Sequence, residues 1–382
     1  MKYGHLELVK VKLKTLTPVF IGSGESLTKK EYIFDRQRKL IYIPDLGKLT
    51  GFLAQRTMLK AYERYLLQTR NNDLYYFLYE NKVGKSDYNK FTLYTLDASE
   101  IINQDKFRGI LTFVKGADGL PYIPGSSLKG AIRTAIAAKL LQKGNYEINI
   151  SNIEKAVSNV NKKDFRYYTN REARNLECGL FNKLDLKDPK YPDRIKWYNS
   201  VNDCMRGIQI SDSKSIDFKH LTICGKYDRK PDGNTNVLPI YRECLIPGTT
   251  TEFYMTLDKP VLSKWSIDLD YIQDALDVFM DLYHGKFSSY FRDRREDTEN
   301  IQLNGNLILG GGAGYATKTI SYPLIQNRDR ALDLVQKIMI KEFPKHKHEK
   351  DTAVHKVSPH TLKTTVYKGR YYGMGKCHIT FA

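Results

Sequence analysis

The sequence predicts an α+β fold made of two ferredoxin-like (RRM-like) domains with helical insertions. Strand patterns alternate with single helix patterns in two successive sets, which is the order expected for that fold class. The 382 residues allow two or three domains, and 41% of them are apolar, enough for sizeable cores. No fixed-period repeat of the solenoid kind is visible. We place the first domain at 1–213 and the second, which contains a glycine-rich loop, at 214–382.

The first elements follow from local patterns near the start of the chain. Residues 5–16 place apolar side chains at nearly every second position, which predicts a long strand with one buried face. The glycines of 22–25 indicate a loop. Residues 31–35 and 39–44 read as a hairpin with a polar connection, and a Pro-Asp pair then opens an amphipathic helix over 46–69.

The remainder of the first domain has a weaker pattern. Residues 70–118 are rich in Tyr, Asn and Lys, and we expect short helices inserted into the domain. Residues 120–142 predict a strand, a Pro-Gly break and a helix. The polar, basic stretch 145–203 is a second insertion, with a helix at 151–161, and a strand at 207–213 closes the domain.

The second domain has its own strands and helices. The predicted elements are strands at 219–228, 238–246 and 250–257, a turn at 246–249, a helix at 268–284, a charged loop at 291–300, a strand at 306–311 leading into the glycine-rich loop, a helix at 328–342 and a final strand at 375–381. Each strand shows an apolar run or alternation, and each helix shows apolar residues at helical spacing.

The charge balance points to a polyanionic partner. The chain has 61 Lys and Arg against 43 Asp and Glu, a net charge of +18 with a pI of about 9.4. An excess of that size favours nucleic acid as the partner, with an anionic membrane surface second. No window approaches the ~20 apolar residues of a membrane span, and the first residues lack the apolar run of a signal peptide. The five cysteines are odd in number and widely spaced, so we expect a soluble, cytoplasmic chain without disulfides.

The segment around 126–133 is the first candidate binding site. Ser126 and Ser127 follow the Pro-Gly break, where their hydroxyls can cap a helix whose free N–H groups attract anions. Lys129 and Arg133 stand four residues apart on one flank, so both cations can follow a phosphate backbone. A capped helix with a solvated basic flank is the equally good structural alternative. The spacing is not that of a nucleotide-binding P-loop.

Glycine-rich segments supply the other candidates. Between 309 and 319 the residues of interest are Gly310, Gly311, Gly312, Gly314, Tyr315 and Lys318. The glycines leave backbone N–H groups open to a ligand, and the tyrosine and lysine suit an unstacked base and a phosphate. A tight turn is the alternative. Gly22, Ser23 and Gly24 form a weaker candidate of the same kind, as does the basic, aromatic segment 368–377.

No catalytic or metal-binding constellation is visible. Four histidines, His346, His348, His355 and His360, lie in a lysine-flanked stretch without metal-site spacing, where we expect a mobile, solvated loop and no metal. The other histidines considered, His5, His284 and His378, are isolated, and any of them could be a general base or nothing. We predict no cofactor and no enzymatic activity.

Taken together, three motifs resemble the RAMP superfamily of CRISPR proteins. They are IPGSSLKGAIRTA at 123–135, LGGGAGYATKT at 309–319 and TPVFIGSGE at 17–25. The segments 22–35 and 41–49, followed by an insertion, are most similar to the fifth-subunit family of type III-A (Csm) effector complexes. By motif order the resemblance spans essentially the whole chain.

The resemblance implies a function as well as two RRM-like domains. Such a subunit is non-catalytic, binds the 3′ region of the CRISPR RNA and caps that side of the complex in antiviral defence. It contacts the neighbouring backbone RAMP subunit and the small helical subunit, and it supports assembly and guide 3′-end maturation through recruited host ribonucleases. By position, Ser126, Ser127, Lys129 and Arg133 match the helix that holds guide phosphates, and Gly310 to Gly314 with Lys318 match the glycine-rich loop.

Two other functions stay open. One is a metal-independent RAMP endoribonuclease that processes precursor CRISPR RNA, with His5, His284 or His378 as its base. The other is a protein scaffold whose basic charge meets acidic neighbours. Target cleavage by the backbone subunit depends on a loop aspartate, and the nearest candidate here, Asp35, is expected at the end of a strand instead.

Overall fold

The computed structural model describes residues 2–68, 73–101, 107, 109–159, 161–291 and 304–382. Its strands are β1 (Lys2–Tyr3), β2 (Leu6–Thr15), β3 (Gly22–Thr28), β4 (Ile33–Asp35), β5 (Leu40–Pro44), β6 (Thr92–Asp97), β7 (Gly109–Phe113), β8 (Lys187–Asp188), β9 (Tyr191–Ile195), β10 (Ile208–Ile210), β11 (Leu221–Arg229), β12 (Thr235–Leu245), β13 (Thr250–Asp258), β14 (Leu307–Ile308), β15 (Leu362–Tyr367), β16 (Arg370–Gly373) and β17 (Lys376–Phe381). The α-helices are α1 (Leu46–Gln55), α2 (Leu59–Leu67), α3 (Leu74–Glu80), α4 (Gly125–Leu141), α5 (Glu147–Asn159), α6 (Lys162–Phe181), α7 (Lys259–Ser263), α8 (Leu269–Lys286), α10 (Ser321–Leu324) and α11 (Arg328–Glu342).

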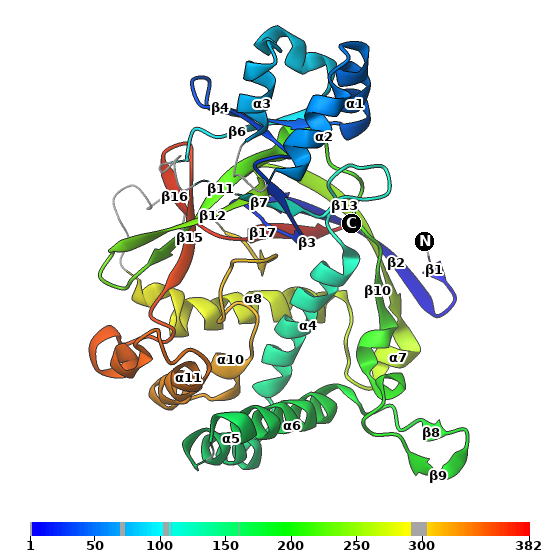
Figure 1. The fold of residues 1–382 in the computed structure, drawn as a ribbon. Helices are drawn as coiled ribbons and strands as arrows, with labels where there is room; N and C mark the ends of the chain where they lie inside the picture. Colours follow the sequence, from blue (N-terminus) through cyan, green and yellow to red (C-terminus); the bar gives the residue numbers. More distant parts are fainter. Residues whose placement is uncertain (1, 69–72, 102–106, 108, 160, 292–303) are drawn as a thin grey trace.

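The first six-stranded sheet has the order β10–β13–β2–β17–β14, with β1 paired to β2, and all its pairings are antiparallel. The strand predicted over 5–16 is confirmed as β2, which buries Val9, Val11 and Leu13 on one face. Helices α4 and α8 pack against each other and share the large core with this sheet through Ile132 and Leu276. Figure 1 shows α8 running beneath the sheets, with α4 crossing near one end of it.

The second six-stranded sheet has the order β16–β15–β11–β12–β7–β3. Its pairings are antiparallel except β7 with β12, which is parallel. The loop expected at 22–25 is wrong, because these residues begin the edge strand β3. A register shift between Gly22 and Ser26 places a bulge there, and bulges are common at sheet edges. The sequence also missed β7, β15 and β16.

A small lobe holds the hairpin β4–β5, the strand β6 and helices α1 to α3, and its helices project from the rest of the chain (Figure 1). Its sheet packs on the large core through Phe34, Ile41 and Leu96. The predicted hairpin is confirmed, but the helix expected over 46–69 is split into α1 and α2. Thr57 has a left-handed φ of +57° at the break. The lobe has its own core, which includes Leu49, Leu53 and Leu74. The insertion 70–118 contributes β6 and β7 as well as short helices, so a purely helical insertion is wrong.

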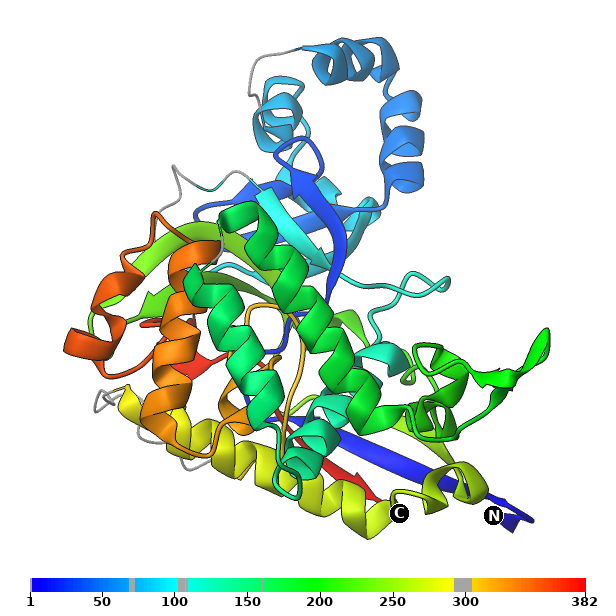
Figure 2. The same ribbon diagram turned by 90° about the horizontal axis from the view of Figure 1, so that it is seen from below.

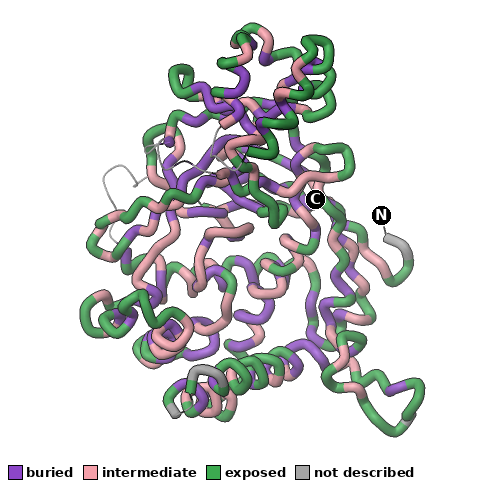
Figure 3. Tube along the Cα trace, in the orientation of Figure 1, coloured by how far each residue is buried: buried purple, intermediate pink, exposed green. Residues whose placement is uncertain are grey.

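The second insertion forms a helical layer. Figure 2 shows α5, α6 and α11 side by side, and ion pairs join them, since Arg330 contacts Glu147 and Glu154 while Arg166 contacts Glu342. The insertion contains the long helix α6, which the sequence missed, in addition to α5 at the predicted helix. The hairpin β8–β9 projects from the layer and is mostly exposed (Figure 3).

The second half follows its predicted elements closely. Strands β11, β12, β13 and β17 and helices α8 and α11 confirm them within a few residues. The strand expected over 306–311 is reduced to β14, and the one expected before α4 is only a single bridge between Lys115 and Pro121. The charged loop 291–300 lies outside the described residues, apart from Phe291. The division at residue 213 stays a prediction, and both large sheets combine strands from before and after that point.

Candidate nucleic-acid interface

The N-terminus of α4 is held by an aspartate rather than by its serines. The N-cap is Pro124, without a side-chain cap, and the N–H of Gly125 donates to Asp212 Oδ1 at 2.8 Å. The predicted capping by Ser126 and Ser127 is therefore wrong. A Cβ at position 125 would overlap the carbonyl oxygen of residue 210, which explains the glycine. The two serine side chains remain at the surface or partly exposed.

The two cations of α4 have different surroundings. Arg133 Nη1 lies 2.7 Å from Asp203 Oδ2, and its guanidinium lies 4.0 Å from the ring centroid of Phe181. Lys129 is half-buried, and burial lowers the pKa of its ammonium, opposed by the charge of Asp203. No side chain in the described part of the structure forms an ion pair with Lys129. An unneutralised, partly desolvated lysine is the better candidate for a phosphate contact.

The glycine-rich loop lies on the chain's own N-terminal motif. The N–H of Gly311 donates to the carbonyl oxygen of Phe20 at 2.6 Å. A Cβ at Gly310 would overlap that same oxygen, and one at Gly312 would overlap the guanidinium of Arg242. Both glycines have left-handed φ, near +84° and +82°. These glycines therefore allow close packing of the chain on itself, which the sequence had assigned to ligand approach.

Beyond its glycines the loop meets α4 across a hollow of about 400 Å³. Its lining includes Arg133, Tyr315 and Lys318, so two motifs far apart in sequence come together. The hydroxyl of Tyr315 pairs with that of Ser321 at 2.7 Å, which fixes the ring. Lys318 is an exposed residue, but desolvation of its ammonium group lowers the pKa of that group. It forms no ion pair with any of the residues described.

Two further hollows share lining residues with a neighbouring hollow. The second, about 480 Å³, shares Tyr315 and is lined by Lys226, Lys230 and Lys363. The third, about 490 Å³, shares Lys230 with the second. We call the three together the Tyr315 groove. These lysines were missed because no motif marks them, and Lys363 also lies on β15, a strand that the sequence missed. Burial lowers the pKa of Lys226, with Asp228 opposing, while Lys363 pairs with Asp228 at 2.9 Å.

The remaining candidates lie elsewhere. Gly22, Ser23 and Gly24 are exposed at the bulge of β3, where Ser23 Oγ pairs with Thr112 Oγ1 at 2.6 Å. They do not line the Tyr315 groove. The segment 368–377 contributes Tyr371 to a separate hollow of about 350 Å³, described next.

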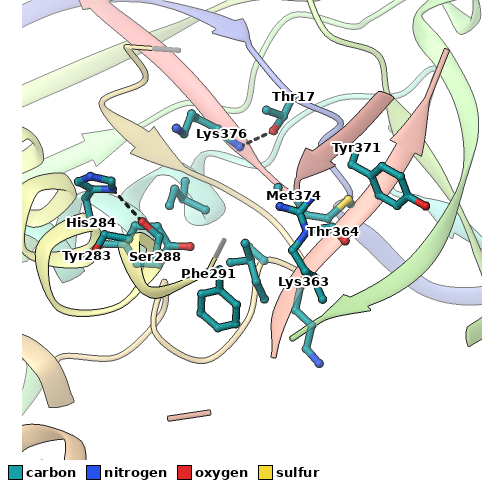
Figure 4. A pocket seen from close by; sticks show the side chains of 16 residues that line it. Thr17, Tyr283, His284, Ser288, Phe291, Lys363, Thr364, Tyr371, Met374 and Lys376 are labelled. Carbon is teal, nitrogen blue, oxygen red and sulfur yellow. Dashed lines mark hydrogen bonds between the residues drawn. The ribbon is translucent and has the colours of Figure 1, made fainter. Parts of the chain in front are cut away.

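That separate hollow lies between α8 and the strands β15 to β17 (Figure 4). His284 Nδ1 pairs with Ser288 Oγ at 3.1 Å, and the N–H of Lys376 donates to Thr17 Oγ1 at 2.8 Å. Its described lining has one histidine and no carboxylate. His378 instead pairs with the carbonyl oxygen of residue 304. His284 and His378 thus contact different parts of the chain and do not form a catalytic pair.

Asp35 and Asp351 are both buried and are held by contacts within the chain. Asp35 ends β4 and is 1% exposed, and its carboxylate accepts the N–H of Gln37 and pairs with Lys85 at 2.8 Å. In the histidine stretch, His348 and Asp351 are buried, so the expected mobile, solvated loop is wrong. A short 3₁₀ turn and a π-type turn order this segment.

The comparisons with known proteins agree with these motifs. The family model for the RAMP superfamily matches residues 12–339. The CRISPR system Cms protein Csm5 of Streptococcus thermophilus is 30% identical over 319 residues, 81% of this chain and 79% of that protein. Csm5 of Enterococcus italicus is 28% identical over 417 residues, covering 98% and 97%.

Solved structures show the same fold. A chain in the cryo-EM structure of a Csm–crRNA–target RNA ternary complex superposes with a TM-score of 0.63 at 22% identity, covering 98% of this chain and all of that one. The crystal structure of T. onnurineus Csm5 gives a TM-score of 0.60 at 21% identity, covering 96% and 99%. Within the described residues, no helix is long and apolar enough to cross a membrane. The chain belongs to the RAMP superfamily and, within it, to the Csm5 family of CRISPR proteins.

Proposed function

We propose that the chain is a non-catalytic subunit that binds CRISPR RNA and caps the 3′ side of a type III-A (Csm) effector complex. In this role it supports assembly of the complex and maturation of the guide's 3′ end in antiviral defence. Family membership supports the assignment, and a structural neighbour is part of a complex that contains crRNA and target RNA. The Tyr315 groove is the observation that carries the RNA-binding part.

The groove has the properties of a backbone-binding surface. Lys318 in the glycine-rich loop and Lys226 on β11 line the groove, and burial lowers the pKa of both. Burial also lowers the pKa of Lys129, which lies on α4 one turn before Arg133, a residue of the lining. A desolvated ammonium gains the most from a phosphate, and contacts of this kind position RNA without reading its sequence. Ring contacts from Tyr315 would hold an unstacked base. Sequence recognition is left to base pairing by the guide.

We propose that each of the sequence candidates either contacts RNA or shapes the surface that does. Tyr315 and Lys318 contact RNA in the groove. Lys129 contacts it from α4 beside the groove, and Ser126 and Ser127 add hydroxyls at the start of that helix. Arg133 acts mainly through its contacts with Asp203 and Phe181. The glycines 310, 311, 312 and 314 shape the loop, and the exposed bulge of Gly22, Ser23 and Gly24 is a separate contact.

The expected ferredoxin-like architecture has support in the first sheet. In chain order β2, α4, β10, β13, α8 and β17 form a β-α-β-β-α-β unit, and its strands lie side by side as β10–β13–β2–β17. We infer that this is one of the two RRM-like units. It takes three elements from 1–213 and three from 214–382, so the proposed boundary divides the unit in sequence but not in space.

The surroundings of the polar residues favour the non-catalytic function over the endoribonuclease. Asp35 is buried, and its carboxylate pairs with Lys85 and accepts backbone N–H groups at Oδ1, so it is engaged within the fold. His284 and His378 contact different parts of the chain. The endoribonuclease function would be supported instead if the purified chain cleaved repeat RNA in EDTA and one His→Ala substitution abolished the cleavage.

The experiment is the length of guide RNA in effector complexes purified with and without this chain. We expect untrimmed 3′ ends, or loss of the terminal subunits, when the chain is missing. Mature guides together with loss of target cutting would refute the capping function. The same preparations test the proposed partners, which are the neighbouring backbone RAMP subunit, the small helical subunit and recruited host ribonucleases. We propose no membrane partner and a cytoplasmic location.

Poor RNA binding by the isolated chain, combined with full assembly in its presence, would instead favour the scaffold function. In that case the charge of the Tyr315 groove would serve acidic protein neighbours, and salt would weaken assembly rather than RNA binding.

A further inference from the structure

The third hollow of the Tyr315 groove is unusual in its charge. Its volume is about 490 Å³, and its lining is Lys230, Lys345, His346, Lys347, Lys350, Val354, His355 and His360. Four lysines and three histidines thus face one space, and the lining contains no carboxylate. None of the four lysines forms an ion pair with a carboxylate among the described residues. Gathering unneutralised like charges costs free energy, which a bound anion would relieve.

A buried carboxylate outside the lining holds His360, one of the lining residues, in place. Asp351 is fully buried, and it accepts hydrogen bonds from His348 Nδ1 at 2.9 Å, His360 Nδ1 at 2.6 Å and Ser358 Oγ at 2.6 Å. Gln336 of α11 donates to the carbonyl oxygens of residues 348 and 349, which ties the segment to the helix. The histidine stretch is therefore a fixed surface.

The same contacts orient the histidines. Because Nδ1 of His360 is used by Asp351, its Nε2 is the ring nitrogen left to face the hollow that His360 lines. The ring of His355 stacks on that of His360, with centroids 4.9 Å apart. Burial and the neighbouring His360 lower the pKa of His355, with Asp351 and Asp232 opposing. The hollow thus combines lysine ammonium groups with imidazole rings held in fixed orientations.

We propose that this hollow is a binding pocket for a phosphate group of RNA. The inference rests on the proposed RNA-binding function and names a specific site for it. The hollow joins the rest of the groove through Lys230, His346 and His360, so a strand that follows the groove would deliver a phosphate into it. That phosphate is either the terminal one of the strand or one of its backbone.

A metal ion is the competing occupant, because donor atoms of His348, Asp351 and His360 lie within 4.8 Å of one another. The hydrogen bonds argue against it. Both oxygens of Asp351 already accept from imidazole N–H groups, so a metal would have to displace those protons. The surrounding lysines would also repel a divalent cation. The geometry therefore favours an anion.

The test uses the full chain with two exposed lysines removed. The variant is Lys345→Ala with Lys350→Ala, and Lys347 is kept so that the left-handed backbone at its φ of +57° is left unchanged. The matched control is Lys48→Ala with Lys60→Ala, which removes the same charge from exposed positions of the small lobe. The probe is a fluorescent single-stranded RNA, prepared with a 3′-hydroxyl and with a 3′-phosphate, and its affinity is measured across a salt series.

If both lysines contact phosphate, the salt slope of the variant falls by about 1.4, which corresponds to roughly 25-fold weaker binding at 0.1 M salt. The control is expected to keep the affinity and slope of the wild type. A terminal-phosphate pocket makes the wild type prefer the 3′-phosphate RNA, a preference that the variant loses. A backbone-phosphate pocket weakens both RNAs equally in the variant.

A variant that binds both RNAs like the control overturns the pocket, while the RNA-binding function stands on the other hollows. Should the wild type itself fail to bind RNA, the proposed function fails, and calorimetry with pyrophosphate then decides the pocket. Binding that the lysine variant loses supports it. Absence of pyrophosphate binding overturns it, as does zinc binding that His360→Ala abolishes.

Discussion

Substitutions of Arg133 and Lys129 on α4 distinguish a cation that stabilises the fold from one that binds RNA. The perturbations are Arg133→Ala and Lys129→Ala, made separately. Arg133 loses a partly exposed ion pair with Asp203, worth about 1 kcal/mol, and a ring contact with Phe181, worth about 1 kcal/mol. Lys129 has no ion pair among the described residues to lose, so its removal should leave the free energy of unfolding nearly unchanged.

The size of both effects can be worked out. At about 2.1 cal/mol/K per residue, the unfolding entropy of the 382-residue chain is about 0.8 kcal/mol/K. A loss of about 2 kcal/mol for Arg133→Ala therefore lowers Tm by about 2–3 °C. Lys129→Ala should lower the salt slope of RNA binding by about 0.7, which is about fivefold in affinity at 0.1 M salt.

The assay combines a thermal unfolding curve with RNA anisotropy at several salt concentrations for each variant. Arg133→Lys serves as a control, because it keeps the charge but loses the planar stacking on Phe181. The reasoning is refuted if Arg133→Ala keeps the Tm of the wild type and lowers the salt slope by a full contact. In that case the guanidinium leaves Asp203 to bind phosphate.

Three further predictions concern stability. Gly310→Ala should lower the free energy of unfolding by about 2–4 kcal/mol in denaturant titration, because the new Cβ overlaps the carbonyl of Phe20 at a left-handed φ. Lys115→Met should cost about 3–5 kcal/mol by the same titration, since it leaves the fully buried carboxylate of Glu243 without its 2.7 Å ion pair. Hydrogen bonds from the histidines and Ser358 hold the pKa of Asp351 below its usual value against the opposing effect of burial, so its contribution is present above about pH 4 and lost as pH falls further. Asp351→Asn should therefore lower Tm at pH 7 and flatten its fall in acid.

Each of these has a clear opposite result. Gly314→Ala is the control for the loop, because its Cβ would meet only the flexible side chain of Lys363, and equal losses at both glycines would contradict the overlap. An unchanged stability of Lys115→Met would mean that Glu243 is protonated or reached by water. A Tm for Asp351→Asn equal to that of the wild type at neutral pH would show that the histidine segment is held by other contacts.

The contrast between α11 and the α4 cap shows how far local pattern reaches. Helix α11 begins and ends where the periodicity predicts, at 328 and 342, because its Asn327 cap and apolar face are both encoded nearby. The cap of α4 comes instead from Asp212, which is 87 residues away. A short polar pattern cannot report a partner at that distance, so Ser126 and Ser127 looked like the cap.

The missed strands have a similar cause. Strand β3 is exposed, glycine-rich and bulged, and its strand conformation depends on hydrogen bonds to β7. Periodicity detects strands that bury one face, such as β2, and it does not detect edge strands whose only stabilisation is pairing. Composition identified 70–118 and 145–203 as insertions. Which helices and strands they form depends on packing against the rest of the chain, so composition did not predict those elements.

The sequence by itself determined the family, the basic charge and the motifs shared with that family, because these depend on residue identity and order. Tertiary structure decided which cations remain available for a phosphate. Arg133 is neutralised by Asp203, while Lys318 and the lysines around Asp351 are not. Electrostatic availability depends on which carboxylates fold nearby, and neighbours at long sequence distance are set only by packing.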